Sequence, residues 1–242
     1  MNDAPPTSLL VADSLLVDGG LALAAGVHRS RFVDSVRAQA PDLGDAAGAF
    51  WDRAVRGVPA TGSWFPRITL DTSGAFGVSL RSAPARTTSL RLHSARVDPR
   101  TTPLIKGPDL ARLDALRQEA VRAGADEAVI VSPEGLVVEG GYSSIAWWRG
   151  DALCVVDDTL ERLPGVTENS LVTIATAFGV TVLRELVEPD DLADHEVWSL
   201  GSLHGPRIAT SWVGGPTVAE QPGRLRLWRA RLDALRRSVH SH

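Results

Sequence analysis

Short turns between strand-like runs limit the fold of this chain more than any other feature of its sequence. Residues 64–70 and 75–80 both read as strands, and Asp71-Thr72-Ser73-Gly74 between them is typical of a hairpin turn. Further strands are predicted at 127–131, 135–138 and 145–148, with turns at 133–135 and 149–151. Because hairpins pair neighbouring strands antiparallel, they argue against a strictly alternating β/α barrel. The sequence therefore predicts a mixed α+β or α/β protein.

Helices separate these groups of strands. Periodic apolar residues predict helices at 27–40, 45–56, 108–123, 168–178 and 223–238, and a short one at 189–194. The remaining strands are expected at 8–17, 89–97 and 180–186, with two extended runs between 197 and 212. The stretch 82–87 (SAPART) interrupts the pattern. We therefore expect a smaller N-terminal α/β domain over 1–81, a linker at 82–87 and a larger C-terminal domain over 88–242.

The overall composition is that of an ordinary soluble globular protein. The chain has 242 residues, of which 44% are hydrophobic and 22% are charged. A net charge of −4 gives no electrostatic case for binding nucleic acid. No apolar run reaches the length of a membrane span, and the N-terminus does not resemble a signal peptide, so we expect a cytoplasmic protein. The lone Cys154 lies in an apolar run and is interpreted as a buried hydrophobic residue.

Lys106 is the only lysine among the 25 lysine and arginine residues of the chain. A chain so rich in arginine can use arginine wherever it needs only a positive charge. The ε-amine of lysine, in contrast, can lose its proton and form a Schiff base. Pro103, Leu104 and Ile105 precede it, and an apolar setting lowers the pKa of an amine. From the count alone, two interpretations of Lys106 remain open: a lysine that forms a Schiff base, and a surface lysine kept by chance.

Four other segments carry residues that suit a site for a phosphorylated cofactor. Glu139 follows an apolar strand and precedes the small-residue loop that contains Ser143 and Ser144. A carboxylate there can bind a ring nitrogen, as in a pyridoxal phosphate site, although a strand-end glutamate facing solvent would look the same. The Leu163-Pro164-Gly165-Val166-Thr167 turn opens a predicted helix. Its backbone N–H groups and the Thr167 hydroxyl suit a phosphate, or form an ordinary helix cap.

The other two segments are weaker signals. Ser202 lies in a polar turn between apolar strands. Arg31 lies one turn beyond His28 on the first predicted helix, where a guanidinium can reach a phosphate. Taken alone, each is better interpreted as surface or turn chemistry.

Taken together and in chain order, these motifs resemble the class IV aminotransferases. The order is H-x-x-R-F, then Lys106, then E-G-x-x-S, then L-P-G-V-T, then a G-S-L-x-G turn, over residues 8–212. This family contains the fold-type-IV pyridoxal phosphate enzymes, including branched-chain and D-amino acid aminotransferases and 4-amino-4-deoxychorismate lyases. The resemblance implies a two-domain protein, usually a homodimer, with pyridoxal 5′-phosphate between the domains.

The resemblance also implies roles for individual residues. Lys106 would be the Schiff-base lysine, and Glu139 would bind the pyridine nitrogen. The other expected cofactor-binding residues, several of them at the phosphate, are Arg31, Ser143, Ser144, Gly165, Val166, Thr167 and Ser202. The chain also departs from the family pattern. The tyrosine common a few residues after the lysine is absent, since Gly107, Pro108, Asp109 and Leu110 follow, and the only tyrosine is Tyr142.

The expected function is a pyridoxal-phosphate-dependent aminotransferase that acts on the amino group of a small amino or keto acid. One alternative is a 4-amino-4-deoxychorismate lyase, which releases pyruvate and p-aminobenzoate. The other is a catalytically inactive relative that binds the cofactor or a partner. Metal, nucleic acid and membrane are not expected as partners. Candidates for binding the substrate are Arg67, Arg81, Tyr142, His204 and Arg207.

Overall fold

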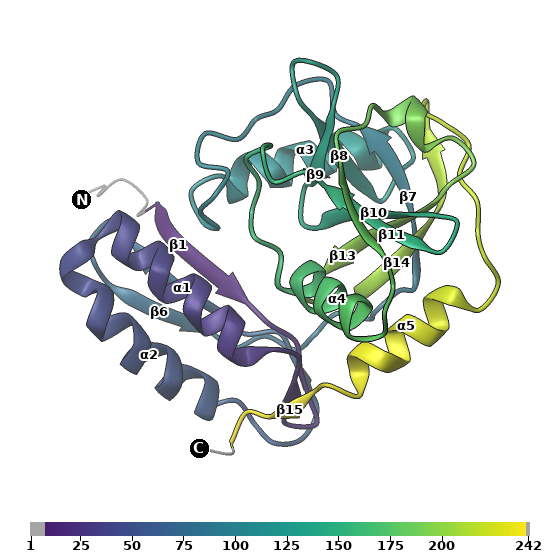
Figure 1. Cartoon of the computed structure of the whole chain (residues 1–242). Helices are drawn as coiled ribbons and strands as arrows, with labels where there is room; N and C mark the ends of the chain where they lie inside the picture. Colours follow the sequence, from purple (N-terminus) through teal and green to yellow (C-terminus); the bar gives the residue numbers. More distant parts are fainter. Residues whose placement is uncertain (1–7, 241–242) are drawn as a thin grey trace. The chain divides into compact units, whose positions relative to one another are not determined.

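The protein, described here by a computed structural model covering residues 8–240, divides into two compact units. The first unit contains the described residues through Ala85, then Ile105–Leu110, then the stretch from Leu235 onward. The second contains Arg86–Leu104 and Ala111–Ala234. Both units are therefore discontinuous in sequence, whereas the sequence prediction used contiguous ranges. Figure 1 follows the chain through its elements.

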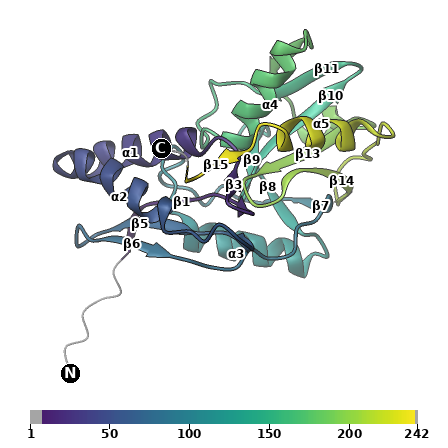
Figure 2. The same ribbon diagram turned by 90° about the horizontal axis from the view of Figure 1, so that it is seen from below.

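In its described residues, the first unit contains two α-helices, one 3-10 turn and two small sheets. Its helices are α1 (Ala25–Gln39), η1 (Pro41–Leu43, a 3-10 turn) and α2 (Gly44–Arg56). Its strands are β1 (Leu9–Ser14), β2 (Val17–Asp18), β3 (Leu21–Ala22), β4 (Ser63–Trp64), β5 (Arg67–Asp71), β6 (Phe76–Ser79) and β15 (Arg237–Ser238). One sheet has the order β1-β5-β6 and the other β15-β3-β2-β4. Helices α1 and α2 lie side by side along the first sheet (Figure 2).

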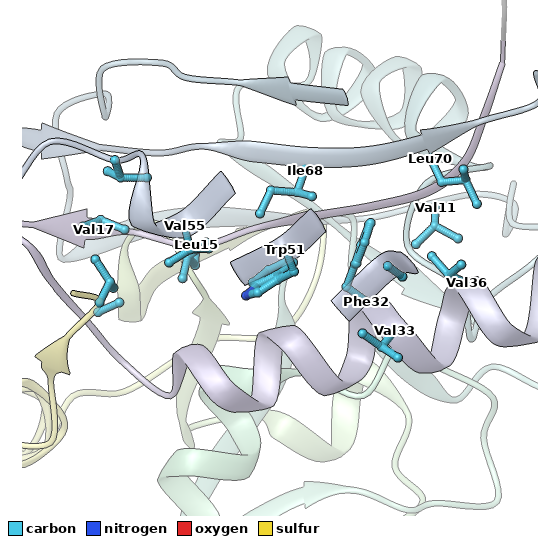
Figure 3. Close-up of a cluster of buried hydrophobic side chains, with 14 residues drawn as sticks. Val11, Leu15, Val17, Phe32, Val33, Val36, Trp51, Val55, Ile68 and Leu70 are labelled. Atoms are coloured by element: carbon cyan, nitrogen blue, oxygen red, sulfur yellow. The ribbon is translucent and has the colours of Figure 1, made fainter. Parts of the chain in front are cut away.

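Alternation along the strands decides which face of the first sheet is buried. Ile68 and Leu70 of β5 are fully buried, whereas Arg67, Thr69 and Asp71 between them are only partly buried. The buried side chains pack against the apolar stripe of α1 and against Trp51 of α2 (Figure 3). The predicted hairpin is confirmed, since β5 and β6 pair antiparallel and the Asp71 side chain accepts the Ser73 N–H at 2.8 Å.

The second unit is organised around one mixed sheet of eight strands. Its strands are β7 (Ser89–Ser94), β8 (Glu127–Val131), β9 (Val137–Gly140), β10 (Ser144–Arg149), β11 (Ala152–Val156), β12 (Val182–Glu185), β13 (Glu196–Gly201) and β14 (Gly205–Val213). Its helices are α3 (Leu110–Arg122, whose first residue belongs to the first unit), α4 (Val166–Ala177), η2 (Pro189–Leu192) and α5 (Arg224–Asp233). The strand order is β12-β11-β10-β13-β14-β7-β8-β9. The sheet curls, because its end strand β9 also contacts β10 and β11.

Large aromatic side chains fill the core of the second unit. The indole rings of Trp147 and Trp198 are fully buried, and Trp148 packs against Trp228 of α5 with 5.4 Å between ring centroids. Helices α4 and α5 lie together, with the Arg231 guanidinium 4.1 Å from the ring of Phe178. The sequence-predicted mixture of hairpins and helices is confirmed, and strand 127–131 has the predicted bounds.

The predicted helix over 223–238 is wrong at its C-terminal end. Helix α5 stops at Asp233, and Arg237 and Ser238 form β15 instead. Strand β15 pairs with β3, and the next residue, Val239, donates its N–H to Gly20 O at 3.0 Å. Val239 is buried in the first unit's core, so tertiary packing overrides the helical pattern that Leu235 continues in the sequence. In the described part of the chain, no helix is long and apolar enough to cross a membrane.

Candidate active site

The residues predicted to carry chemistry fall into two groups, one in each unit. Lys106 and Arg31 belong to the first unit. Glu139, the serines Ser143, Ser144 and Ser202, and the 163–167 turn belong to the second. Each group has its own set of hydrogen bonds and ion pairs.

Lys106 lies on a short segment that is fastened to β1. Its carbonyl oxygen accepts the Ala12 N–H at 2.6 Å, and Ile105 packs against the first unit's core. Gly107 has a φ of +141°, and a Cβ there would come within 2.9 Å of the backbone of Val11 and Ala12. Only glycine allows this approach. The backbone that carries the only lysine is therefore held at a defined position along β1.

A buried charge cluster is centred on Asp13 of the same strand, a residue that the sequence did not single out. The Asp13 side chain accepts hydrogen bonds from Arg31 through Nε at 2.8 Å and Nη2 at 2.9 Å. His28 Nδ1 lies 2.8 Å from Asp13 Oδ1, and the Ser14 N–H donates to the same oxygen at 2.7 Å. An aspartate at the end of the apolar run LLVAD was the only available signal.

The charges in this cluster determine the protonation of Asp13 and His28. Burial alone would raise the pKa of Asp13, but Arg31 and His28 hold that pKa well below its ordinary value. Burial lowers the pKa of His28, Asp13 opposes that shift, and Arg31 and Lys106 add smaller lowering effects. Asp13 therefore stays ionised and binds two donor groups of Arg31, the residue predicted to bind phosphate.

Glu139 is the next-to-last residue of β9, and its side chain is buried. Its Oε1 accepts Arg100 Nη1 at 2.5 Å, and its Oε2 accepts the Leu163 N–H at 3.3 Å. Burial raises the pKa of Glu139 to about 7, against the opposing effects of Arg100, Leu163 and Arg162. Glu139 is therefore not the solvent-facing strand-end glutamate that the sequence left open. Arg100 was not singled out in the sequence.

The 163–167 turn leads directly into helix α4, as the sequence predicts. Gly165 is the N-cap, and no side chain in the described part of the chain caps this helix. Val166 and Thr167 are its first residues and both are buried. Two features shape the turn. A Cβ on Gly165 would collide with the Ser144 hydroxyl, and Glu168 is held by Arg162 at 2.8 Å. Uncapped N–H groups at a helix N-terminus can bind an anion.

Ser143 and Arg207 belong to a second buried charge network. The carboxylate of Glu127 accepts Ser143 Oγ at 2.6 Å and Ser199 Oγ at 3.0 Å. It also accepts Arg207 Nη2 at 2.5 Å and the Tyr142 N–H at 3.1 Å. Arg207 was predicted to bind substrate, yet its guanidinium is an internal partner of Glu127. This network holds the loop that follows Glu139.

Tyr142, Ser202 and His204 lie in loops of the second unit. The Tyr142 hydroxyl donates to the Asp114 carboxylate of α3, and the ring is partly exposed. Ser202 and His204 lie in the turn between β13 and β14. His204 Nδ1 accepts the Thr87 N–H at 3.1 Å, and burial together with nearby arginines lowers the pKa of His204 to about 4. His204 is therefore neutral near pH 7.

Arg67 and Arg81 lie in the first unit without a carboxylate partner in the described part of the chain. Arg67 of β5 is paired with Ser14 of β1 on one side and with Ser79 of β6 on the other. Its side chain lies on the face of the sheet away from the core. Arg81 donates through Nε to Phe65 O at 3.2 Å and stacks over that ring, while its buried Nη2 has no hydrogen-bond partner. Burial and the charge of Arg67 both lower the pKa of Arg81.

A cavity of about 360 Å³ opens within the second unit beside Arg100. Its lining includes Asp98, Thr101, Pro103, Ser132, Val138 and Glu161. Val138 and Glu139 are consecutive strand residues, so their side chains point to opposite faces of β9. Val138 thus faces the cavity and Glu139 faces away from it, and Arg100 both borders the cavity and contacts Glu139.

The fold is that of the fold-type-IV aminotransferases. A hypothetical aminotransferase from Mycobacterium tuberculosis, solved in a PLP-bound form, superimposes with a TM-score of 0.74. The match covers 93% of this chain and 87% of that one at 21% identity. A Legionella pneumophila protein provisionally named 4-amino-4-deoxychorismate lyase gives 0.76, covering 96% and 97% at 14% identity.

Sequence comparison assigns the family. The family model described as Amino-transferase class IV matches residues 11–212. The chain belongs to this family of enzymes. A branched-chain-amino-acid aminotransferase from Pseudomonas aeruginosa is 32% identical over 75 residues, which are 31% of this chain and 24% of that relative.

Proposed function

We propose that this chain is a pyridoxal-phosphate-dependent aminotransferase that acts on a small amino or keto acid and uses Lys106 as its covalent link to the cofactor. The observation that carries the proposal is the uniqueness of Lys106 in a chain with 25 basic residues. The segment around it is fixed to β1 by a backbone hydrogen bond and by the close approach of Gly107. A surface lysine kept by chance would need neither.

The residues present suit the cofactor. The uncapped N-terminus of α4 offers backbone N–H groups at Val166 and Thr167 to a phosphate. Ser144 lies against Gly165, and Ser202 lies in the turn between β13 and β14. Arg31 stays a predicted phosphate-binding residue, as the motif order implies.

Glu139 suits the ring nitrogen. Each oxygen of a carboxylate can accept two hydrogen bonds, and among the described residues one donor contacts each oxygen of Glu139. When bound, the cofactor supplies an electron sink that stabilises negative charge on the substrate α-carbon. Glu139 would keep a proton on the ring nitrogen, and Lys106 Nζ would remove and return the proton on the α-carbon.

Arg67 and Arg81 are the most suitable binding groups for a substrate carboxylate. Both carry charge that no carboxylate in the described part of the chain neutralises, and the Arg81 Nη2 atom lacks a partner. Arginine binds carboxylates through two parallel hydrogen bonds. In contrast, Arg207 is held by Glu127, and a neutral His204 would contribute no charge. Tyr142 stays a weaker candidate, since its side chain is partly exposed but its hydroxyl already donates to Asp114.

The test is to locate the covalent link. Protein incubated with pyridoxal phosphate and reduced with borohydride should carry a single pyridoxyl label, on the peptide that contains Lys106. Lys106→Arg keeps the charge and should abolish both the label and the visible absorption band of bound cofactor. The matched control is Arg91→Lys, which adds a second lysine at an exposed ion pair with Asp126 and should leave the label on Lys106. A cofactor band that survives in Lys106→Arg would rule out the assignment.

The lyase stays as a second candidate function. It is favoured by the similarity to the Legionella pneumophila protein over 97% of that chain. Formation of p-aminobenzoate from aminodeoxychorismate would support the lyase. Pyruvate production that depends on alanine and a keto-acid acceptor would support the aminotransferase. A third outcome, label without turnover of either substrate, would identify a cofactor-binding relative that lacks activity.

We further propose that the chain assembles as a homodimer.

A further inference from the structure

Arg100 is the side chain that holds Glu139. Its Nη1 donates to Glu139 Oε1 at 2.5 Å, and only 6% and 10% of the two side chains are exposed. The two residues are 39 positions apart in sequence, and both belong to the second unit. The contact therefore depends on the fold and not on local chain geometry.

The Arg100 guanidinium is itself fixed on its other sides. Nε donates to Asp98 Oδ1 at 2.9 Å and Nη2 donates to Asp98 Oδ2 at 2.7 Å, a two-point ion pair. Nη1 also donates to the Glu161 carbonyl at 3.1 Å. With these hydrogen bonds the guanidinium has little freedom to rotate. Because Nη1 also donates to Glu139 Oε1, the position of that oxygen is fixed as well.

The charges around Glu139 decide how easily it ionises. Burial disfavours the anion, and Arg100 is the nearest cation that compensates. The other charged groups nearby are Asp98, which pairs with Arg100, and Arg162, which is held by Glu168. Arg162 has a carboxylate of its own, so it cannot replace Arg100. Loss of Arg100 would leave Glu139 in a buried site with no direct cation.

We propose that Arg100 is a positioning residue that acts through Glu139: it orients the carboxylate and keeps it ionisable in a buried site, with lone pairs left for a ring N–H donor. The inference rests on the proposed function, in which Glu139 binds the pyridine nitrogen. Among the described residues, the hydrogen bonds of Arg100 reach Asp98, Glu139 and the Glu161 carbonyl, so its effect on the predicted site passes through Glu139. A neutral Glu139 would not stabilise a proton on the ring nitrogen.

The test follows the titration of Glu139 in protein free of cofactor. Isotope-edited infrared or carbon NMR of glutamate-labelled protein reports the carboxylate, and the signal missing in Glu139→Gln identifies residue 139. With a pKa of about 7, wild-type Glu139 should be about half ionised at pH 7. Arg100→Gln should lower the ionised share at pH 7 to below about a tenth, a shift of one pH unit or more. Arg100→Lys keeps the charge and should recover part of the loss.

Matched controls separate this role from a structural one. Arg91→Gln removes an exposed arginine from the same unit and should leave the titration unchanged. If Arg100→Gln does not fold, Arg100→Met tests the same loss of charge in a side chain of similar length. An unchanged midpoint in a folded Arg100 variant would overturn the proposal. The proposed function would fail separately, through the absence of a borohydride label on Lys106 in the wild-type protein.

Discussion

Asp13 shows how one buried carboxylate can organise several basic groups. It accepts hydrogen bonds from Arg31, His28 and the Ser14 N–H, and none of its surface is exposed. Removing one partner of a buried ion pair leaves an uncompensated charge, which costs far more than an exposed pair contributes. The position of Arg31 therefore depends on Asp13.

We expect Asp13→Asn to lower the free energy of unfolding by about 3–5 kcal/mol, because Arg31 would stay buried without its counter-ion. Chemical denaturation at pH 7 measures this. The matched control is Asp34→Asn, whose exposed pair with Arg37 should cost less than about 1 kcal/mol. Equal effects of the two substitutions would show that the cluster is not the stabilising feature proposed here.

The same cluster makes stability depend on pH in one direction. The pKa of Asp13 is lowered in the folded state, so its contribution is complete above its unfolded pKa of about 3.9 and is lost as the pH falls. The pKa of His28 is also lowered, so its contribution is present above about 6.5 and likewise declines on acidification. Wild-type stability, measured by chemical denaturation at each pH, should thus fall from pH 7 toward pH 3, and a flat profile would contradict this linkage.

At the scale of the element, helix α4 depends on a glycine that admits a neighbouring hydroxyl. Gly165 has ordinary dihedral angles (φ −70°, ψ 120°), so its role is not conformational. Glycine is needed here because there is no room for a side chain: a Cβ on residue 165 would collide with Ser144 Oγ. The same Cβ would lie 3.5 Å from the Cβ atoms of Ser144 and Glu168, which is an ordinary contact distance. One atom therefore accounts for the need for glycine.

We expect Gly165→Ala to lower the free energy of unfolding by about 1–3 kcal/mol and to weaken binding of inorganic phosphate, since the start of α4 must move. Adding Ser144→Ala removes the colliding oxygen and should restore most of the stability. Thermal unfolding and a phosphate titration of the single and double variants measure both effects. If the double variant is no better than Gly165→Ala alone, the collision is not the reason for glycine.

Elements with strong local patterns were predictable, and residues whose partners lie far away in sequence were not. The apolar stripe of α1 and the Asp71 turn carry their own signals, so the helix and hairpin could be expected from a few neighbouring residues. Lys106 stood out by composition alone. Arg100, Asp13 and Glu127 did not, because their partners are 39, 18 and 80 positions away and ordinary charged residues give no sign of such pairing.

At the scale of the whole molecule, the first unit needs the C-terminal stretch of the described chain. Val239 is buried in its core, next to β15, which pairs with β3. We expect Val239→Ala to lower the free energy of unfolding by roughly 1–2 kcal/mol through loss of buried apolar surface. Val27→Ala on the exposed side of α1 is the control and should change stability by less than about 0.5 kcal/mol. A neutral Val239→Ala would show that this stretch docks without stabilising the unit.

Discontinuity of the first unit has a consequence for the order in which the protein forms on the ribosome. About 150 residues separate Ala85 from Leu235, which at roughly 5–20 residues per second takes on the order of 10–30 s to translate. Throughout that interval the residues of β1, α1 and α2 have been made. Strand β15, which pairs with β3 of the same unit, has not. The second unit is itself complete only at Ala234, so its last helix and the last strand of the first unit are made almost together.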